Sequence, residues 1–279
     1  MPIILDQVNE TDSGTDIQVD PGLVYHRASA FSPRRNNSDF HRIHRIYSQQ
    51  VSGEKQISYK VYPWKERIAL SLTRPKPLNA PLPELLNSRH STRNFSEGGL
   101  NFDELSEVLR LSSGLKVYDG ALASVPVRTR TVPSPGGAYS LEQYLVIRNV
   151  KGLQPGIYHY SAIEGCICRI ADLPDDNELH LKAASDMISL PPVLFFITSV
   201  FQRNVEKYGA RGFRLIYMEA GHLGQNLYLA ATHLGLSGCY IGGGIDGYIQ
   251  KLLGLDSFSE VFLSSFAMGR SAYQGAQHD

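Results

Sequence analysis

The chain has 279 residues, of which 42% are hydrophobic, and this is enough to bury the core of one large domain or two small ones. Lys plus Arg and Asp plus Glu both number 27, so no net positive charge favours nucleic acid or an anionic membrane. No stretch is long and apolar enough to span a membrane, and the N-terminus lacks the basic region of a signal peptide. We therefore predict a globular, cytoplasmic protein with no nucleic-acid or membrane partner.

Composition divides the chain into three parts. Residues 1–22 are rich in Asp, Thr, Gly and Gln and have little periodicity, which is typical of a mobile tail. Residues 23–80 mix aromatic side chains with a basic run and end in a proline-rich linker, which predicts an extension packed on the main domain. Residues 81–279 carry regular helix and strand patterns and form that main domain.

The first clear element of the main domain is a helix over 101–111, with Asn101 as its N-cap, Glu104 at the third helical position and Gly114 beyond its end. Several short segments rich in β-branched and aromatic residues then predict strands. The predicted strands cover 144–150, 156–160, 166–171, 193–200, 239–241 and 261–268, and a short helix covers 248–253.

The strongest predicted helix covers 211–234, where apolar residues recur at steps of three and four. Further apolar residues occupy its other sides, so the helix is apolar nearly all round and must be buried. Glu219 and His222 make it a poor membrane span, which leaves the protein core or a subunit interface. We interpret His222 as a core or interface histidine.

Cysteine and histidine are few and unevenly spaced. Cys166, Cys168 and Cys239 are too few for a disulfide framework, and we predict buried free thiols. His41 and His44 lack neighbours with ligand spacing, so no metal site is predicted.

Two polar segments have the composition of ligand-binding loops. The segment 89–93 offers two guanidinium groups and two hydroxyls, which suit a phosphate and its sugar, although a solvated basic loop has the same composition. The segment 133–139 combines prolines with two glycines, which let main-chain N–H groups approach a ligand, although an ordinary loop before a strand would also fit.

Two further segments surround the predicted long helix. Gly242, Gly244 and Gly247 fit the pattern G-x-G-x-x-G, but the 32 residues after Gly247 are too few for a dinucleotide-binding fold. These glycines still let main chain lie against a flat ring. Lys207 and Tyr208 stand where the long helix begins, and by themselves they fit a helix start with solvated stems.

Taken in order, five segments resemble the nitroreductase superfamily. They are Arg89-His90-Ser91-Thr92-Arg93, Pro133-Ser134 before Gly136-Gly137, Gln225-Asn226-Leu227, Ile241-Gly242-Gly243 and Gly269-Arg270. The resemblance implies an α+β fold, a three-layer sandwich with a central, mostly antiparallel sheet flanked by helices. It also implies an obligate homodimer with two FMN sites at its interface.

Within the superfamily, residues 23–270 resemble the SagB/McbC type, the FMN-dependent dehydrogenases of azoline-containing peptides, through 24–26, 133–144 and 207–214. The resemblance assigns the FMN phosphate and ribityl chain to Arg89, Ser91 and Arg270, and N1 and O2 of the flavin ring to Arg93. It assigns N5 to the main chain of Gly242, Gly243 and Gly244, and a contribution from the second subunit to Pro133, Ser134 and Gly136.

The Lys-Tyr pair is the catalytic signature of these dehydrogenases, which makes Lys207 the general base and Tyr208 its acid or positioning partner. Arg211 and Arg214 are expected to lower the pKa of Lys207 by repulsion. The implied reaction oxidises a thiazoline or oxazoline to the azole, with O2 reoxidising the flavin and a cyclodehydratase supplying the substrate.

The chain also departs from the pattern of its relatives. Gly244 stands where they often carry a bulky residue, and a domain that recruits leader peptides is absent or reduced to 23–80. Two alternatives therefore stay open. One is an NAD(P)H-dependent nitro, quinone or ene reductase, in which Lys207 and Tyr208 only begin a helix. The other is a non-catalytic flavin-containing scaffold of a peptide-modifying complex.

Overall fold

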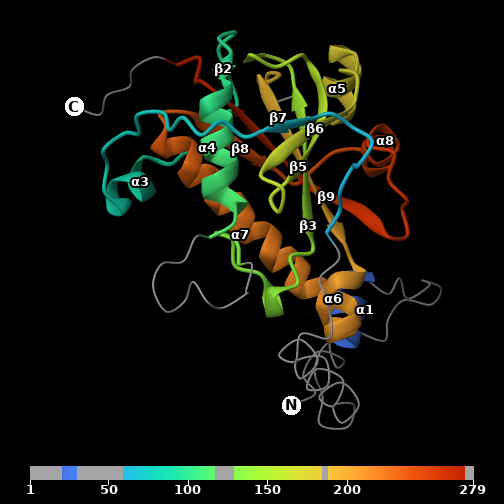
Figure 1. The fold of residues 1–279 in the computed structure, drawn as a ribbon. Helices are drawn as coiled ribbons and strands as arrows, with labels where there is room; N and C mark the ends of the chain where they lie inside the picture. The colour runs from blue at the N-terminus through green and yellow to red at the C-terminus, as the bar shows by residue number, and fades with distance from the viewer. Residues whose placement is uncertain (1–20, 30–58, 117–128, 184–187, 274–279) are drawn as a thin grey trace, which may run out of the picture.

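The computed structural model describes residues 21–29, 59–116, 129–183 and 188–273 (Figure 1). At its centre is a seven-stranded sheet with the strand order β1-β6-β5-β3-β7-β9-β8, in which all neighbours pair antiparallel. The strands are β1 (Arg67–Ala69), β3 (Leu141–Ile147), β5 (Gly156–Ser161), β6 (Cys166–Ala171), β7 (Val193–Val200), β8 (Ser237–Ile241) and β9 (Glu260–Gly269). A small parallel pair joins β2 (Leu100–Asn101) to β4 (Val150–Lys151).

Helices cover both faces of the sheet. The helices of the described residues are α1 (Pro21–Ala28), α3 (Leu82–Ser88), α4 (Phe102–Ser113), the 3-10 turn η2 (Pro135–Gly137), α5 (Asp176–Lys182), α6 (Gln202–Tyr208), α7 (Arg211–His233) and α8 (Asp246–Leu252). On one face α4 and α7 pack against the strands, and on the other α5 and α8 do so. The α+β three-layer sandwich is therefore confirmed.

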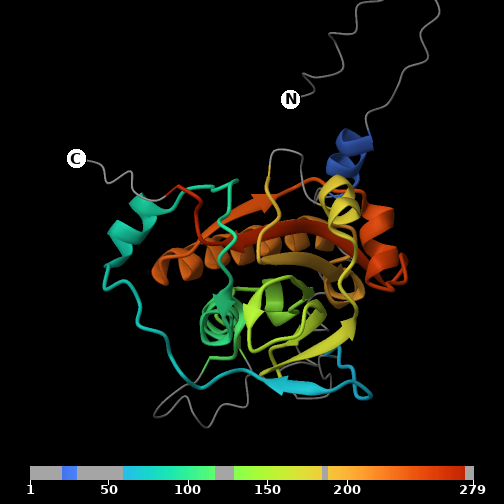
Figure 2. The ribbon, with the colours of Figure 1, turned by 90° about the horizontal axis from the view of Figure 1, so that it is seen from above.

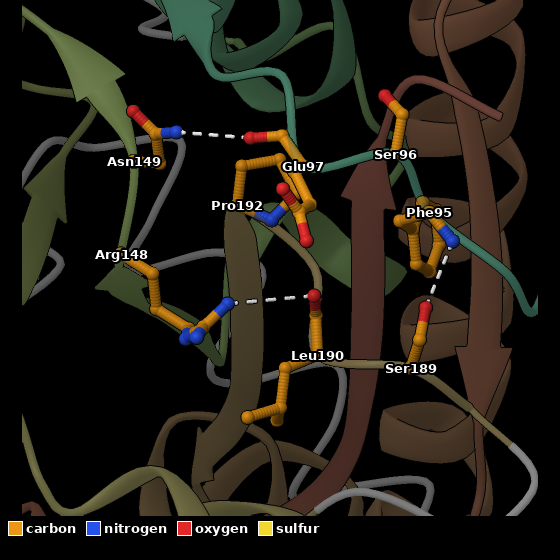
Figure 3. Close-up of a pocket in the computed structure, with 8 residues that line it drawn as sticks. All are labelled: Phe95, Ser96, Glu97, Arg148, Asn149, Ser189, Leu190 and Pro192. Carbon is orange, nitrogen blue, oxygen red and sulfur yellow. Dashed lines mark hydrogen bonds between the residues drawn. The ribbon is translucent and has the colours of Figure 1, made fainter. Parts of the chain in front are cut away.

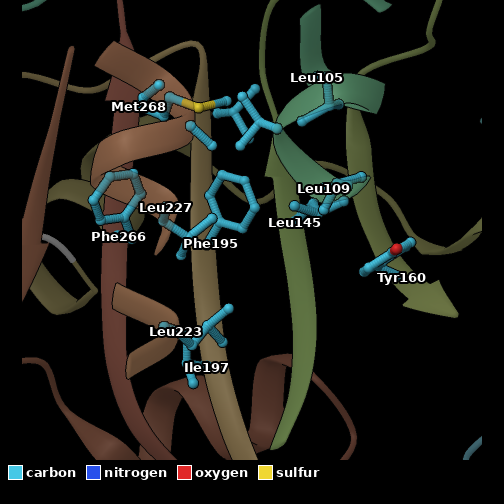
Figure 4. Packing of buried hydrophobic residues seen from close by; sticks show 14 of the residues in the cluster. Leu105, Leu109, Leu145, Tyr160, Phe195, Ile197, Leu223, Leu227, Phe266 and Met268 are labelled. Carbon is cyan, nitrogen blue, oxygen red and sulfur yellow. The ribbon is translucent and has the colours of Figure 1, made fainter. Parts of the chain in front are cut away.

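The larger hydrophobic core lies between the sheet and the pair α4 and α7. Figure 4 shows Leu105 of α4 and Leu223 and Leu227 of α7 around Phe195 of β7, and all four side chains are buried. The opposite core includes Leu179 of α5. Because each sheet face meets its own helix pair, strands β3 and β7 are buried almost throughout, and β7 begins with a continuous hydrophobic run over residues 193–197.

The start of α4 agrees with the prediction in detail. Asn101 is the N-cap and forms a capping box with Glu104, and Gly114 is the C-cap. Glu104 Oε2 accepts a hydrogen bond from the Asn101 N–H at 2.9 Å. This arrangement satisfies N–H groups that the first turn of the helix leaves free, which explains why the helix begins there.

Helix α7 begins at Arg211 as predicted, but it is not buried all round in the single chain. Ile216 and Leu227 face the core, whereas Tyr217 and Met218 are each 57% exposed and His222 is exposed as well. The core therefore covers one side of the helix, and the exposed side is the one that the predicted subunit interface would cover.

The extension before residue 81 contributes to the core sheet. Strand β1 pairs with β6 at the sheet edge, and Lys60 Nζ reaches both Tyr144 Oη and Glu260 Oε2 at 2.5 Å. Helix α1 (blue in Figure 2) lies at the periphery of the described chain, where the Arg214 Nε–H donates to Ser29 Oγ at 2.7 Å. The predicted tail falls almost wholly outside the described residues, and α1 begins at Pro21.

Candidate functional site

The segment 89–95 runs along the free edge of β8. Ser91 forms a parallel bridge with Gly238, and the Thr92 N–H donates to the Gly238 carbonyl at 2.9 Å. Arg93 is exposed and lies near Cys239, where its positive charge opposes the rise in thiol pKa that burial causes. The three cysteines are free and buried, as predicted.

A tyrosine that the sequence does not single out fixes this segment to α7. The Tyr228 hydroxyl lies 2.8 Å from Ser91 Oγ and accepts the Tyr240 N–H at 2.8 Å. The Arg89 guanidinium stacks over the Tyr228 ring, 5.2 Å from its centroid. Tyr228 thus positions two of the predicted phosphate ligands, and only the fold reveals this because it lies 137 residues from Ser91 in sequence.

Arg270 and the predicted glycines Gly242 to Gly244 stand at the two ends of β8. Arg270 follows Gly269, which pairs with Ser237, and its guanidinium donates to Glu104 at 2.6 Å. Gly242 and Gly243 follow the other end, are exposed, and leave open space where a Cβ would stand. A five-residue strand spans about 16 Å, so these groups line an elongated edge.

Lys207 and Tyr208 lie against the predicted Pro-Ser-Gly loop. Lys207 is 2% exposed, and its ammonium group donates to the Gly136 carbonyl at 3.2 Å. Gly136 has a φ of 59°, and a Cβ there would stand 2.2 Å from Tyr208 Oη and 2.6 Å from Lys207 Nζ. Only glycine fits this position, because both the backbone conformation and the space require it.

Burial lowers the pKa of the Lys207 ammonium group. The expected repulsion from neighbouring cations is not among the causes of this shift, and the Arg214 guanidinium instead donates to Ser29 Oγ and to the His26 carbonyl on α1. A low-dielectric surrounding disfavours the charged form of a lysine by itself. Desolvation therefore replaces neighbouring cations as the physical reason.

The two groups of predicted residues lie at opposite ends of α7 in one chain. Figure 1 shows α7 crossing the molecule, with α6 at one end and α3 at the other. Tyr228, which holds the 89–91 segment, and Arg211, which follows the Lys-Tyr pair, are about 26 Å apart along the helix. A single chain therefore brings Arg89 and Ser91 together with each other but not with Lys207.

A cavity of about 580 Å³ lies beside the segment 95–97 (Figure 3). It is lined by Phe95, Ser96, Glu97, Arg148, Asn149, Ser189, Leu190 and Pro192, which include none of the predicted site residues. Its cation, Arg148, already pairs with Asp176 and donates to the Leu190 carbonyl at 3.4 Å. The cavity is thus separate from the predicted site, and its positive charge is neutralised.

Within the described part of the chain, no three or more His, Cys, Asp or Glu side chains gather as a metal site would require. Nor does any helix of that part combine the length and apolarity needed to cross a bilayer. His41 and His44 lie outside the described residues.

Comparisons with known proteins agree with this fold. The model of the nitroreductase family matches residues 86–270. A protein of Methanocaldococcus jannaschii that carries a nitroreductase name is 35% identical over 178 residues, which are 63% of this chain and 86% of that protein. The microcin-processing protein McbC of Escherichia coli is 28% identical over 60% of this chain and 65% of its own length. The trifolitoxin-processing protein TfxB of Rhizobium leguminosarum is 28% identical over 50% of this chain, which spans only 39% of that relative.

Among solved structures, a nitroreductase-like protein of Anabaena variabilis has a TM-score of 0.62 at 25% identity, over 80% of this chain and 47% of its own. A chain of the Escherichia coli microcin synthetase complex McbBCD has a TM-score of 0.57 at 19% identity, over 92% of this chain and all of its own, which shows a shared fold. With a family model that matches most of its length, this chain belongs to the nitroreductase family of oxidoreductases.

Proposed function

We propose that the protein is an FMN-dependent dehydrogenase that oxidises thiazoline or oxazoline rings in a ribosomally made peptide to azoles. The observation that carries this proposal is the buried Lys207 beside Tyr208, held against the Gly136 carbonyl. A nitroreductase needs no buried lysine base, whereas ring oxidation must remove a proton as well as a hydride. Two relatives, McbC and TfxB, are named as processing proteins of peptide products, which supports the same reading.

The residues along β8 fit FMN, which has a phosphate at one end and a flat ring at the other. Arg89, Ser91 and Arg270 supply donors at one end of the strand, and a guanidinium has five N–H groups, so Arg270 can bind a phosphate and Glu104 together. At the other end, Gly242 and Gly243 leave the main chain open to a ring. FMN would supply the hydride acceptor, and Arg93 would stabilise negative charge near N1 of its reduced ring.

We further propose that the complete site forms between two copies of the chain. The exposed Tyr217 and Met218 make α7 suitable as the contact between subunits. In such a homodimer the Lys207 and Gly136 end of one α7 can meet the Arg89 end of the partner's helix. Pro133 and Ser134, which precede Gly136 in the same loop, would then contact the flavin held by the other subunit.

In this mechanism Lys207 Nζ accepts the proton from the azoline ring carbon, and the Tyr208 hydroxyl orients the ring. Lys207 must be neutral to act, and burial lowers its pKa, so a larger fraction of the base is competent near neutral pH. The rate of flavin reduction should therefore rise with pH through the lowered pKa of Lys207, below the pH range in which an exposed lysine titrates.

The proposal is tested by anaerobic absorbance of the flavin-loaded protein, mixed in parallel with an azoline-containing peptide and with NADPH. We expect the peptide to bleach the flavin and NADPH to leave it oxidised. Lys207→Ala should abolish bleaching and keep bound FMN, while Lys182→Ala, at an exposed lysine paired with Glu178, should behave like the unaltered protein. Full bleaching by Lys207→Ala would refute the role of the base.

The nitroreductase alternative is supported by the Methanocaldococcus jannaschii relative, which has the highest identity of the three sequence relatives above. Rapid bleaching by NADPH alone would establish it, and bleaching by neither reagent would favour a flavin-containing scaffold. The fold shared with a chain of the microcin synthetase complex supports a cyclodehydratase as partner. Co-purification of the two proteins tests that partnership.

A further inference from the structure

A buried carboxyl group lies beneath the loop that holds Lys207. Glu219, on α7, is 1% exposed, and its Oε2 accepts a hydrogen bond from Ser140 Oγ at 3.1 Å. The Ser134 hydroxyl, at the start of the same loop, also hydrogen-bonds to this carboxyl group. Burial raises the pKa of Glu219, and hydrogen bonds from Ser134 and Ser140 oppose that rise.

The same loop is held from a second side by one face of α6. The Arg203 guanidinium donates to the Tyr139 carbonyl at 2.9 Å, and the Asn204 side-chain amide donates to Ser140 Oγ at 3.0 Å. One turn later, Lys207 donates to the Gly136 carbonyl at 3.2 Å. Asn204 is fully buried, so Ser140 Oγ joins two buried polar groups, Asn204 and Glu219.

The loop needs such support because one of its residues has an unfavourable backbone conformation. Gly136 and Gly137 adopt φ values of 59° and 64° without strain, but Tyr139, which is not a glycine, has a φ of 45°. Residues held in this region persist only where their surroundings fix them. Burial of a carboxyl group destabilises a protein unless the group is hydrogen-bonded. The hydrogen bond from Ser140 therefore stabilises Glu219 in the core as well as the loop.

We infer that Glu219 is a positioning residue of the Lys207 site: it anchors Ser134 and Ser140, and so keeps the Gly136 carbonyl on the Lys207 ammonium group. The inference rests on the proposed function only in giving Lys207 a catalytic role. The anchoring itself is a property of the loop, and it can be measured without any turnover.

The test measures the pKa of Lys207 by competitive acetylation across pH in the full-length protein, followed by mass spectrometry of the peptide that contains it. In Glu219→Leu the loop loses its anchor, so water takes the place of the Gly136 carbonyl as acceptor and relieves the burial that lowers this pKa; we expect the pKa to rise by about one unit or more. Glu219→Gln keeps an acceptor for Ser140 and should stay close to the unaltered protein. Glu107→Leu removes another buried helical glutamate, on α4, and should leave the pKa of Lys207 unchanged.

An unchanged pKa of Lys207 in folded Glu219→Leu would overturn the inference. If that variant does not fold, Ser140→Ala replaces it, since it removes only the hydroxyl between Glu219 and Asn204. We expect a smaller rise of the same sign, and no rise would again overturn the inference. Retained azoline oxidation in Lys207→Ala would refute only the role of Lys207 as the base, and failure of the peptide to bleach the flavin of the unaltered protein would refute the proposed function; the acetylation result depends on neither.

Discussion

At the scale of single residues, substitutions at two neighbouring glycines distinguish the effect of backbone strain from the effect of close contact. Gly136 and Gly137 both have positive φ, but a Cβ at Gly136 would meet Tyr208 and Lys207, whereas one at Gly137 has nothing within 4 Å. Gly137→Ala should lose about 1 kcal/mol of stability from its backbone conformation alone, and Gly136→Ala should lose more, because Tyr208 and Lys207 must also move. Only Gly136→Ala should slow flavin reduction by the azoline peptide, by about 100-fold, because it displaces the pair. Equal rates for the two variants, measured by stopped-flow absorbance, would contradict this explanation.

Tyr228 offers a second residue-scale prediction. Tyr228→Phe removes the hydroxyl that holds Ser91 Oγ and the Tyr240 N–H while keeping the ring under Arg89. We expect FMN to bind about tenfold more weakly, which corresponds to about 1.4 kcal/mol, and fluorescence titration of the apoprotein measures this. Tyr240→Phe loses a hydroxyl that bonds Ser264 instead, so its FMN affinity should not change. A comparable loss in both variants would mean that general loosening, and not the Ser91 contact, is responsible.

At the scale of elements, the contact between α7 and β8 depends on one glycine. A Cβ at Gly224 would stand 2.5 Å from the Tyr240 ring, so Gly224→Ala must push the helix and the strand apart. Alanine favours a helix by about 1 kcal/mol over glycine, whereas overpacking costs about 1–3 kcal/mol. We expect a net loss of up to about 2 kcal/mol in the free energy of unfolding by urea. Gly247→Ala in α8, where a Cβ meets open space, is the control, and increased stability of Gly224→Ala would show that the helix moves freely.

The elements that the sequence predicted correctly are those with strong periodicity or clear ends. Helix α4 has its capping box, and α7 has a long apolar repeat, so both begin where expected. The short helices α5 and α6 were missed because seven residues are too few for a repeat to emerge, whereas α8, equally short, was found because a glycine-rich turn precedes it. Strand β1 was missed because three residues carry no alternation, and only pairing with β6 defines them.

The candidate site could be predicted residue by residue only in part. Local motifs identified Lys207 and Gly136, whose contact the structure shows. Glu219 and Tyr228 were not found, because a glutamate or tyrosine inside a helix carries no local signal and its partners come from distant segments. Composition does not tell a core from an interface, so the sequence left both open for α7, and the structure shows that the core covers only one side of it.

At the scale of the whole molecule, the distance between the two residue groups along α7 predicts subunit complementation. Arg89→Ala and Lys207→Ala should each abolish azoline oxidation in their own homodimers. A heterodimer of the two, isolated with two different affinity tags, should regain about half of the unaltered rate, because one of its two sites receives both intact residues. An inactive heterodimer would place Arg89 and Lys207 of the same chain in one site.

The strand that the extension adds to the sheet has a consequence for how this protein can be shortened. The family model begins at residue 86, which invites removal of everything before the main domain. Such a chain would lose β1 and Lys60, leaving β6 as an unpaired edge and the buried Glu260 without its cation. An open strand edge is a template for pairing with other chains. The shortened protein should therefore aggregate. Residues 59–69 thus prevent self-association through the edge of the sheet.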